Sequence, residues 1–87
     1  MGISDIRDAF NAVAQPGHTC SRAYLDYQRE RDDNLRITSE WQILTFFGTS
    51  QDGNTFEVKS AKLPPQMDLA TAARETAKAL VEGTPAP

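Results

Sequence analysis

Apolar residues recur at helical spacing near the end of the chain. The stripe within residues 64–83 consists of Leu69, Ala72, Ala73, Thr76, Ala77, Leu80 and Val81. Charged residues fall between its members, so the pattern predicts one amphipathic helix that covers a sheet or a second helix. Asp68 is placed to cap the start of this helix, and Gly83 to end it in a left-handed conformation.

A second amphipathic helix is predicted over residues 4–15. Its apolar face consists of Ile6, Ala9, Phe10 and Val13. Ser4 is placed to cap it, and Asp5 lies in the first turn, where the helix dipole favours a negative charge. Pro16 and Gly17 end the helix, because proline cannot continue the hydrogen-bond ladder.

Between the two helices the apolar positions alternate, which is the pattern of β-strands. In the first strand, residues 19–29, one side carries Ala23, Leu25 and Tyr27, and the other carries Tyr24, Asp26 and Gln28. The charged residues 29–34 predict a turn. Alternation resumes over residues 35–47. We expect one side of this second strand to face the helices: Leu35, Ile37, Trp41, Ile43 and Phe47.

Residues 39–48 also fit a short helix, capped by Ser39 and stopped by Gly48. Their β-branched and aromatic content favours a strand. The turn-forming residues 49–54 follow, and Phe56 and Val58 then alternate with polar neighbours, which predicts a third strand. Two prolines at residues 64 and 65 end that strand.

These elements predict a single α+β domain over residues 1–83, with a flexible tail at residues 84–87. The order is helix, three antiparallel strands, helix (αβββα). Both helices are expected on one face of the sheet, which makes a two-layer sandwich and leaves the second face uncovered.

The uncovered face is expected to be polar, and Arg36, Thr38, Glu40 and Gln42 fit that expectation. Leu44 and Phe46 on the same side of the strand do not, and Tyr24 joins them from the first strand. Three explanations stay open. The strand bends near Thr45 or the chain end covers the patch; the patch is a protein interface, most simply of a homodimer; or it is a base-stacking platform for single-stranded nucleic acid. The acidic residues nearby argue against the last: Asp26, Glu40 and Glu57.

Composition narrows the function classes. The chain has 87 residues and a net charge of −3, and a core this small raises the expectation that a second copy or a partner completes it. Nucleic-acid-binding domains of this size are usually basic. A single cysteine suits a reducing compartment. The N-terminal residues lack the pattern of a signal peptide and no apolar run is long enough to span a bilayer, so we expect a soluble cytoplasmic protein and no membrane partner.

His18 and Cys20 are the only histidine and cysteine, two residues apart in an extended segment. A thiolate beside an imidazole is the minimum for nucleophilic catalysis. An orienting residue and an oxyanion hole are not visible, and one histidine with one cysteine does not make a zinc site. We therefore expect no catalytic residues, no metal and no cofactor.

The distribution of basic residues suggests an alternative function, the binding of nucleic acid. Four arginines gather around the first hairpin, and two lysines lie near the end of the third strand: Arg22, Arg29, Arg31, Arg36, Lys59 and Lys62. The order of elements resembles that of the double-stranded RNA-binding domain across nearly the whole chain, which implies contact with a phosphate backbone. That family begins its second helix with a lysine-rich motif. The corresponding residues 67–71 here contain no lysine, and only the alanines Ala70, Ala73 and Ala77 match.

The sequence therefore predicts a non-enzymatic interaction module that binds itself or another protein through the uncovered sheet face. The expected binding residues are Tyr24, Arg36, Gln42, Leu44, Phe46 and Glu57. The alternative is a nucleic-acid-binding domain that uses Arg29, Arg31, Arg36, Lys59 and Lys62.

Overall fold

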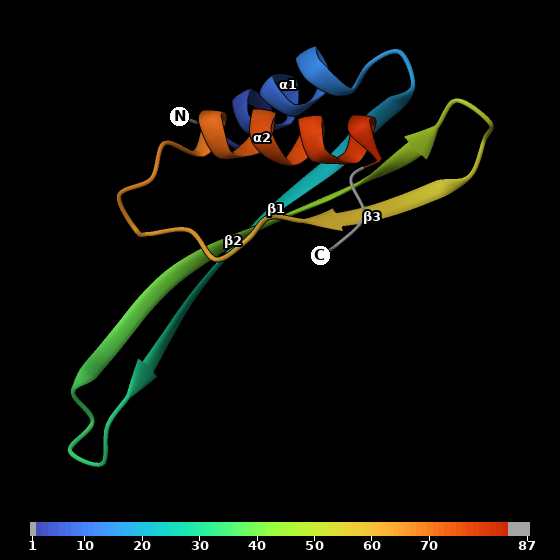
Figure 1. The fold of residues 1–87 in the computed structure, drawn as a ribbon. Helices are drawn as coiled ribbons and strands as arrows, with labels where there is room; N and C mark the ends of the chain where they lie inside the picture. Colours follow the sequence, from blue (N-terminus) through green and yellow to red (C-terminus); the bar gives the residue numbers. More distant parts are fainter. Residues whose placement is uncertain (1, 84–87) are drawn as a thin grey trace.

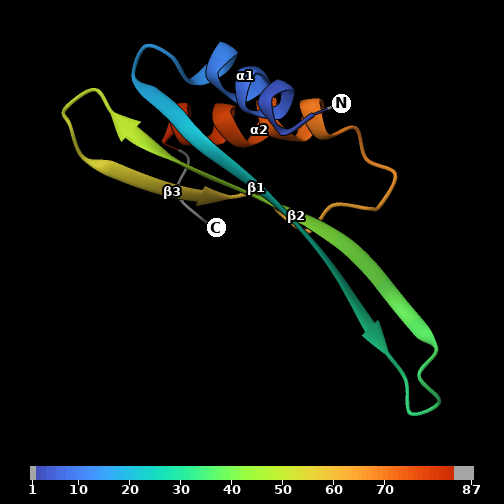
Figure 2. The same cartoon turned by 180° about the vertical axis from the view of Figure 1, so that it is seen from behind.

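The computed structural model describes residues 2–83 and confirms the predicted order of elements. Its elements are α1 (Ile3–Ala14), β1 (His18–Arg31), β2 (Ile37–Ser50), β3 (Thr55–Lys59) and α2 (Leu69–Glu82). The strands form one antiparallel sheet in the order β1-β2-β3, with β2 in the centre. Both helices lie side by side on one face of this sheet (Figures 1 and 2). The tail expected at residues 84–87 lies outside the described residues.

The two helices begin and end for identifiable reasons. In α2, the Asp68 carboxylate accepts a hydrogen bond from the Ala70 N–H at 3.3 Å, and Gly83 adopts the left-handed conformation with φ 59°. Both features agree with the sequence. In α1, the cap is Gly2 instead of Ser4, and the Asp5 carboxylate accepts from the Gly2 N–H at 3.1 Å. The helix therefore begins one residue earlier than predicted.

The core lies between the helices and the part of the sheet that they cover. Its buried members come from both helices, the first two strands and the loop before α2: Ile6, Phe10, Ala14, Cys20, Leu44, Phe46, Leu63, Ala72, Ala73 and Ala77. The Phe10 ring on α1 stacks on the Phe46 ring on β2, with 4.3 Å between centroids. The alanines of α2 let the two helices and the sheet approach closely. Val81, expected on the same stripe, is 50% exposed.

Gly48 allows the backbone of β1 to lie very close to that of β2. A β-carbon at this position would overlap the backbone carbonyl of Thr19. The register of β1 against β2 shifts between Cys20 and Arg22, so β1 carries a bulge beside this contact. The bulge and the missing side chain together let the strands bend under the helices.

The β1–β2 hairpin extends well beyond the helices (Figure 1). Every residue from 24 to 40 is exposed, and we call this segment the arm. At its tip, the Asp32 carboxylate accepts from the backbone N–H groups of Asn34 and Arg36, both at 2.9 Å. At its base, the backbone of Gln42 pairs with that of Leu63. The arm is therefore an ordered two-stranded ribbon that the helix layer leaves uncovered.

The close approach at Gly48 predicts a severe effect of Gly48→Ala. Because the new methyl group meets backbone and not a flexible side chain, we expect a loss of at least about 3 kcal/mol in the free energy of unfolding. Urea titration of the two proteins measures it. Gly17→Ala is the matched control, since its nearest atom would be 3.9 Å away. Equal unfolding midpoints for wild type and Gly48→Ala would contradict the close approach of the two backbones at Gly48.

The Asp68 cap predicts a pH effect in acid. The Thr71 hydroxyl donates to the Asp68 carboxylate at 2.7 Å, and this bond lowers the pKa of Asp68. A lowered folded-state pKa contributes stability above the unfolded value of about 3.9, and that stability is lost as the pH falls through the folded pKa. Asp68→Asn keeps a capping oxygen but does not ionise. We expect the thermal midpoint of wild type to fall more steeply than that of Asp68→Asn below about pH 4; parallel curves would contradict the assignment.

Candidate functional site

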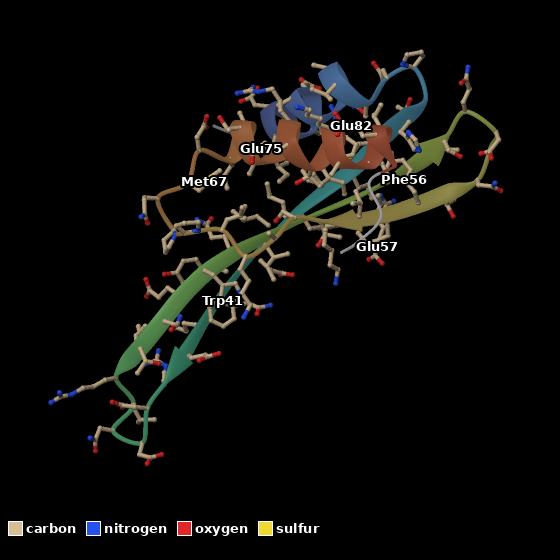
Figure 3. All side chains as sticks on the ribbon, in the orientation of Figure 1. Trp41, Phe56, Glu57, Met67, Glu75 and Glu82 are labelled. Carbon is tan, nitrogen blue, oxygen red and sulfur yellow. The ribbon has the colours of Figure 1, made fainter. Side chains whose placement is uncertain are left out.

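Strand pairing determines which face of the sheet each residue occupies, because directly opposed residues of an antiparallel pair share a face. Ala23 pairs with Phe46, and both lie on the helix-covered side, which we call the inner face. Tyr24 pairs with Thr45 on the opposite side, the outer face. Figure 3 shows the same alternation on β3: Phe56 points toward α2 and its neighbour Glu57 points away from the helices.

The predicted facing of β2 is wrong by one residue. Leu44 and Phe46, expected outside, are both 0% exposed beneath the helices. Trp41, Ile43 and Phe47, expected inside, occupy the outer face. The misleading signal came from the other apolar residues of that phase, Leu35 and Ile37. Both lie in the arm, are exposed, and are out of reach of either helix.

The outer face forms a shallow open hollow of about 1020 Å³ that crosses all three strands. The Tyr24 and Phe47 rings meet edge to face in it, with 5.6 Å between centroids. Tyr24 is 47% exposed and Phe47 is half-buried. Thr45 on β2, which is paired with Tyr24 and lies two residues from Phe47, is buried. No helix or loop in residues 2–83 covers this aromatic pair.

Four charged side chains surround the aromatic pair. Phe47 pairs with Arg22 on one side and with Glu57 on the other, while Asp26 and Lys59 line the hollow farther along. Within the described part of the chain no ion pair joins these four, since the one ion pair found is between neighbours on α1. The hollow thus has an apolar centre and a rim of both signs.

Trp41 lies on the outer face of β2 near the base of the arm, where it is paired with Gln28 (Figure 3). The Lys62 ammonium lies over its ring, 4.4 Å from the centroid, a cation–π contact. The indole N–H is buried and has no hydrogen-bond partner among residues 2–83. Trp41 is therefore half-buried by a neighbouring loop instead of by the core, where the sequence placed it.

The structure separates the predicted binding residues. Tyr24 and Glu57 line the hollow together. Leu44 and Phe46 are in the core, which removes them from any binding surface. Gln42, expected at the rim, lies on the inner face, is 8% exposed, and donates to the Pro65 carbonyl at 2.7 Å. Arg36 is exposed at the tip of the arm, away from the hollow.

The basic residues expected to bind nucleic acid under the alternative hypothesis lie in three separate places. Arg29, Arg31 and Arg36 belong to the arm, where the Arg31 guanidinium donates to the Leu35 carbonyl at 3.0 Å. Lys59 lines the hollow, and Lys62 covers Trp41. The arm also carries five carboxylates: Asp26, Glu30, Asp32, Asp33 and Glu40. No continuous basic surface results.

His18 and Cys20 both point into the inner side of β1. His18 meets the Phe56 ring edge to face at 5.4 Å, and its Nδ1 is buried without a partner in the described residues. Burial raises the pKa of the Cys20 thiol, which donates to the Arg22 carbonyl at 3.0 Å. A raised pKa keeps the sulfur protonated near neutral pH, which is the opposite of what a nucleophile needs.

Three residues of the hollow were not predicted to bind a protein: Arg22, Phe47 and Lys59. Phe47 was assigned to the core, and Lys59 was assigned only to the nucleic-acid alternative. Arg22 was noted among the basic residues around the first hairpin, and only the strand register places it beside Phe47. The lengths of the elements explain why the facing of β2 was predicted wrongly. A 14-residue strand such as β2 is about 46 Å long, whereas a 12-residue helix such as α1 is about 18 Å long. The helices therefore cover only part of β2, and only the apolar residues in that part decide its inner face.

Comparison with known proteins adds no further constraint. No protein-family model, curated protein or solved structure matches the chain. Within residues 2–83, no three histidine, cysteine or carboxylate side chains gather where a metal ion would bind. None of the helices in that range is long and apolar enough to cross a membrane.

Adjacent phenylalanines on opposite faces give a sharp test of these assignments. Phe46→Ala removes a ring that is fully buried, and we expect it to cost about 3–5 kcal/mol of unfolding free energy. Phe47→Ala removes a half-buried ring and is expected to cost about 1 kcal/mol. Urea denaturation of both variants measures the difference. If Phe47→Ala lowered the unfolding free energy more than Phe46→Ala, Phe47 would be the buried ring, as predicted from the sequence.

Proposed function

We propose that this protein is a non-enzymatic interaction module that docks another protein chain, either a different protein or a second copy, on the outer face of its sheet. The observation that supports it is the Tyr24–Phe47 pair, which sits in an open hollow that no element of residues 2–83 covers. Large aromatic side chains in the centre of a patch supply most of the affinity in protein interfaces. A single free cysteine suits action in the cytoplasm.

The rim of the hollow indicates the kind of partner. Arg22 and Lys59 supply positive charge, and Asp26 and Glu57 supply negative charge. A polar rim of mixed sign around an aromatic centre is the usual anatomy of a protein–protein interface. It fits a partner that inserts an apolar side chain between charges of both signs. A phosphate backbone would meet as many carboxylates as cations here, which disfavours the nucleic-acid alternative.

A benzophenone-bearing phenylalanine analogue at position 47 tests this proposal. Irradiation in an extract of the source cells is expected to yield a covalent adduct with another protein chain, whose mass identifies the partner. The matched control places the same analogue at position 81, where Val81 is 50% exposed on α2, and this helix lies on the other face of the sheet from the hollow. Adding Tyr24→Glu to the position 47 protein is expected to reduce the adduct strongly.

Two outcomes would contradict the proposal. Equal adduct yields at positions 47 and 81 would show that labelling follows exposure alone. Absence of an adduct at position 47, together with retention of duplex RNA that declines steeply as salt is raised, would favour the nucleic-acid alternative.

A further inference from the structure

The free edge of β1 along the arm carries backbone groups that have no partner among residues 2–83. On the other strand of the hairpin, Gln42 and Leu44 use their N–H and C=O groups toward the β3 side, in bonds to Leu63 and Ser60. Alternate residues of a strand point these groups to opposite sides, so the odd-numbered residues of β2 bond to β1. The β1 residues between those bonded positions therefore direct their groups outward: Ala23, Leu25, Tyr27 and Arg29.

Nearer the helices, the same edge is closed by a side chain. The Asn11 amide on α1 accepts from the Cys20 N–H at 2.7 Å and donates to the Cys20 carbonyl at 3.1 Å. No comparable contact serves Leu25, Tyr27 or Arg29 within residues 2–83. Unpaired edge groups of this kind are a template for another strand. A two-stranded ribbon without further cover is also only marginally stable in water, so an added strand would stabilise the arm.

Apolar side chains are concentrated along this open stretch. Of the seven large apolar residues that are highly exposed within the described range 2–83, five belong to the arm: Tyr24, Leu25, Tyr27, Leu35 and Ile37. The first three flank the free edge itself. Tyr27 is 46% exposed, and the Arg29 guanidinium lies 5.1 Å from the centre of its ring. The edge thus offers both hydrogen-bonding groups and apolar surface to a strand that pairs with it.

From these observations we infer that the arm is a dimerisation element: the β1 edges of two copies pair antiparallel about a two-fold axis at Tyr27. In this register Tyr27 faces Tyr27 of the second copy, and Leu25 faces Arg29. On the other face, Asp26 meets Gln28 and Tyr24 meets Glu30. Opposed side chains then include an aromatic pair and no like charges.

Charge excludes the neighbouring registers. An axis at Asp26 sets two aspartates directly opposite each other, an axis at Gln28 sets Asp26 against Glu30, and an axis at Arg29 sets two arginines together. Like charges in opposed positions destabilise a strand pair. An axis at Leu25 avoids them, but it moves the pairing toward the bulge and the stretch that Asn11 already closes. Tyr27 is the centre that uses only the open part of the edge.

Because residue 27 would face itself, a charge-swap experiment tests both the surface and the register. The concentration dependence of mass, measured by sedimentation equilibrium, is expected to show a wild-type dimer of the 9.6 kDa chain. Tyr27→Lys and Tyr27→Glu are each expected to raise the dissociation constant at least about tenfold, since each places like charges together. An equimolar mixture of the two variants is expected to dimerise again, as opposite charges then meet. Tyr27 is exposed, so neither variant disturbs the core.

Several results would overturn the inference. A wild-type protein that stays monomeric throughout the accessible concentration range would do so, as would a Tyr27→Lys variant that dimerises like wild type. A mixture that stays monomeric would reject the Tyr27-centred register. Val81→Lys on α2, at a position that is 50% exposed and belongs to neither surface, serves as the control and is expected to dimerise normally. Phe47→Asp distinguishes the β1 edge from the outer face. If it abolishes the dimer while Tyr27→Lys does not, self-association belongs to the outer face, and the edge inference fails while the proposed docking surface stands.

Discussion

The stacking of Phe10 on Phe46 is the contact on which the arrangement of this small domain depends. It lies between α1 and the central strand and fixes which side of β2 faces the helices. Side chains of a strand alternate between faces, so one buried position determines all the others. With Phe46 inside, Leu44 follows it into the core, and Phe47 and Ile43 must lie on the outer face. The aromatic hollow there is a direct consequence.

A second constraint follows from length. The helices are roughly half as long as the β1–β2 hairpin, so one end of the hairpin extends past them as the arm (Figure 1). Residues 24–40 are all exposed, yet at the tip the Asp32 carboxylate accepts hydrogen bonds from the backbone N–H groups of Asn34 and Arg36. A core this small cannot cover the arm, so the apolar side chains of the arm stay exposed to water, which is unfavourable. The outer hollow and the β1 edge are two places where such surface is available to a second chain, and they adjoin each other, because Tyr24 and Asp26 line the hollow and also belong to the arm.

The sequence was sufficient for the elements and insufficient for the facing of β2. Helical spacing, the cap at Asp68, the left-handed Gly83 and the turn residues are local signals, and each appears where predicted. The facing of β2 is not local. Its residues 41–47 are apolar on both sides, so the pattern supports either phase. Leu35 and Ile37 favoured the wrong one, because the pattern does not reveal that the helices end before reaching them. Tyr24 was placed correctly, since β1 alternates clearly.

The most direct test of this account is the set of nuclear Overhauser contacts among the aromatic rings in the labelled protein. The rings of Phe10 and Phe46 lie 4.3 Å apart, and those of Tyr24 and Phe47 lie 5.6 Å apart. The account predicts strong cross-peaks within each of these two pairs and none between Phe10 and Phe47. A cross-peak between Phe10 and Phe47, with Phe46 in contact with Tyr24, would show that β2 presents its other side to the helices and would contradict the account.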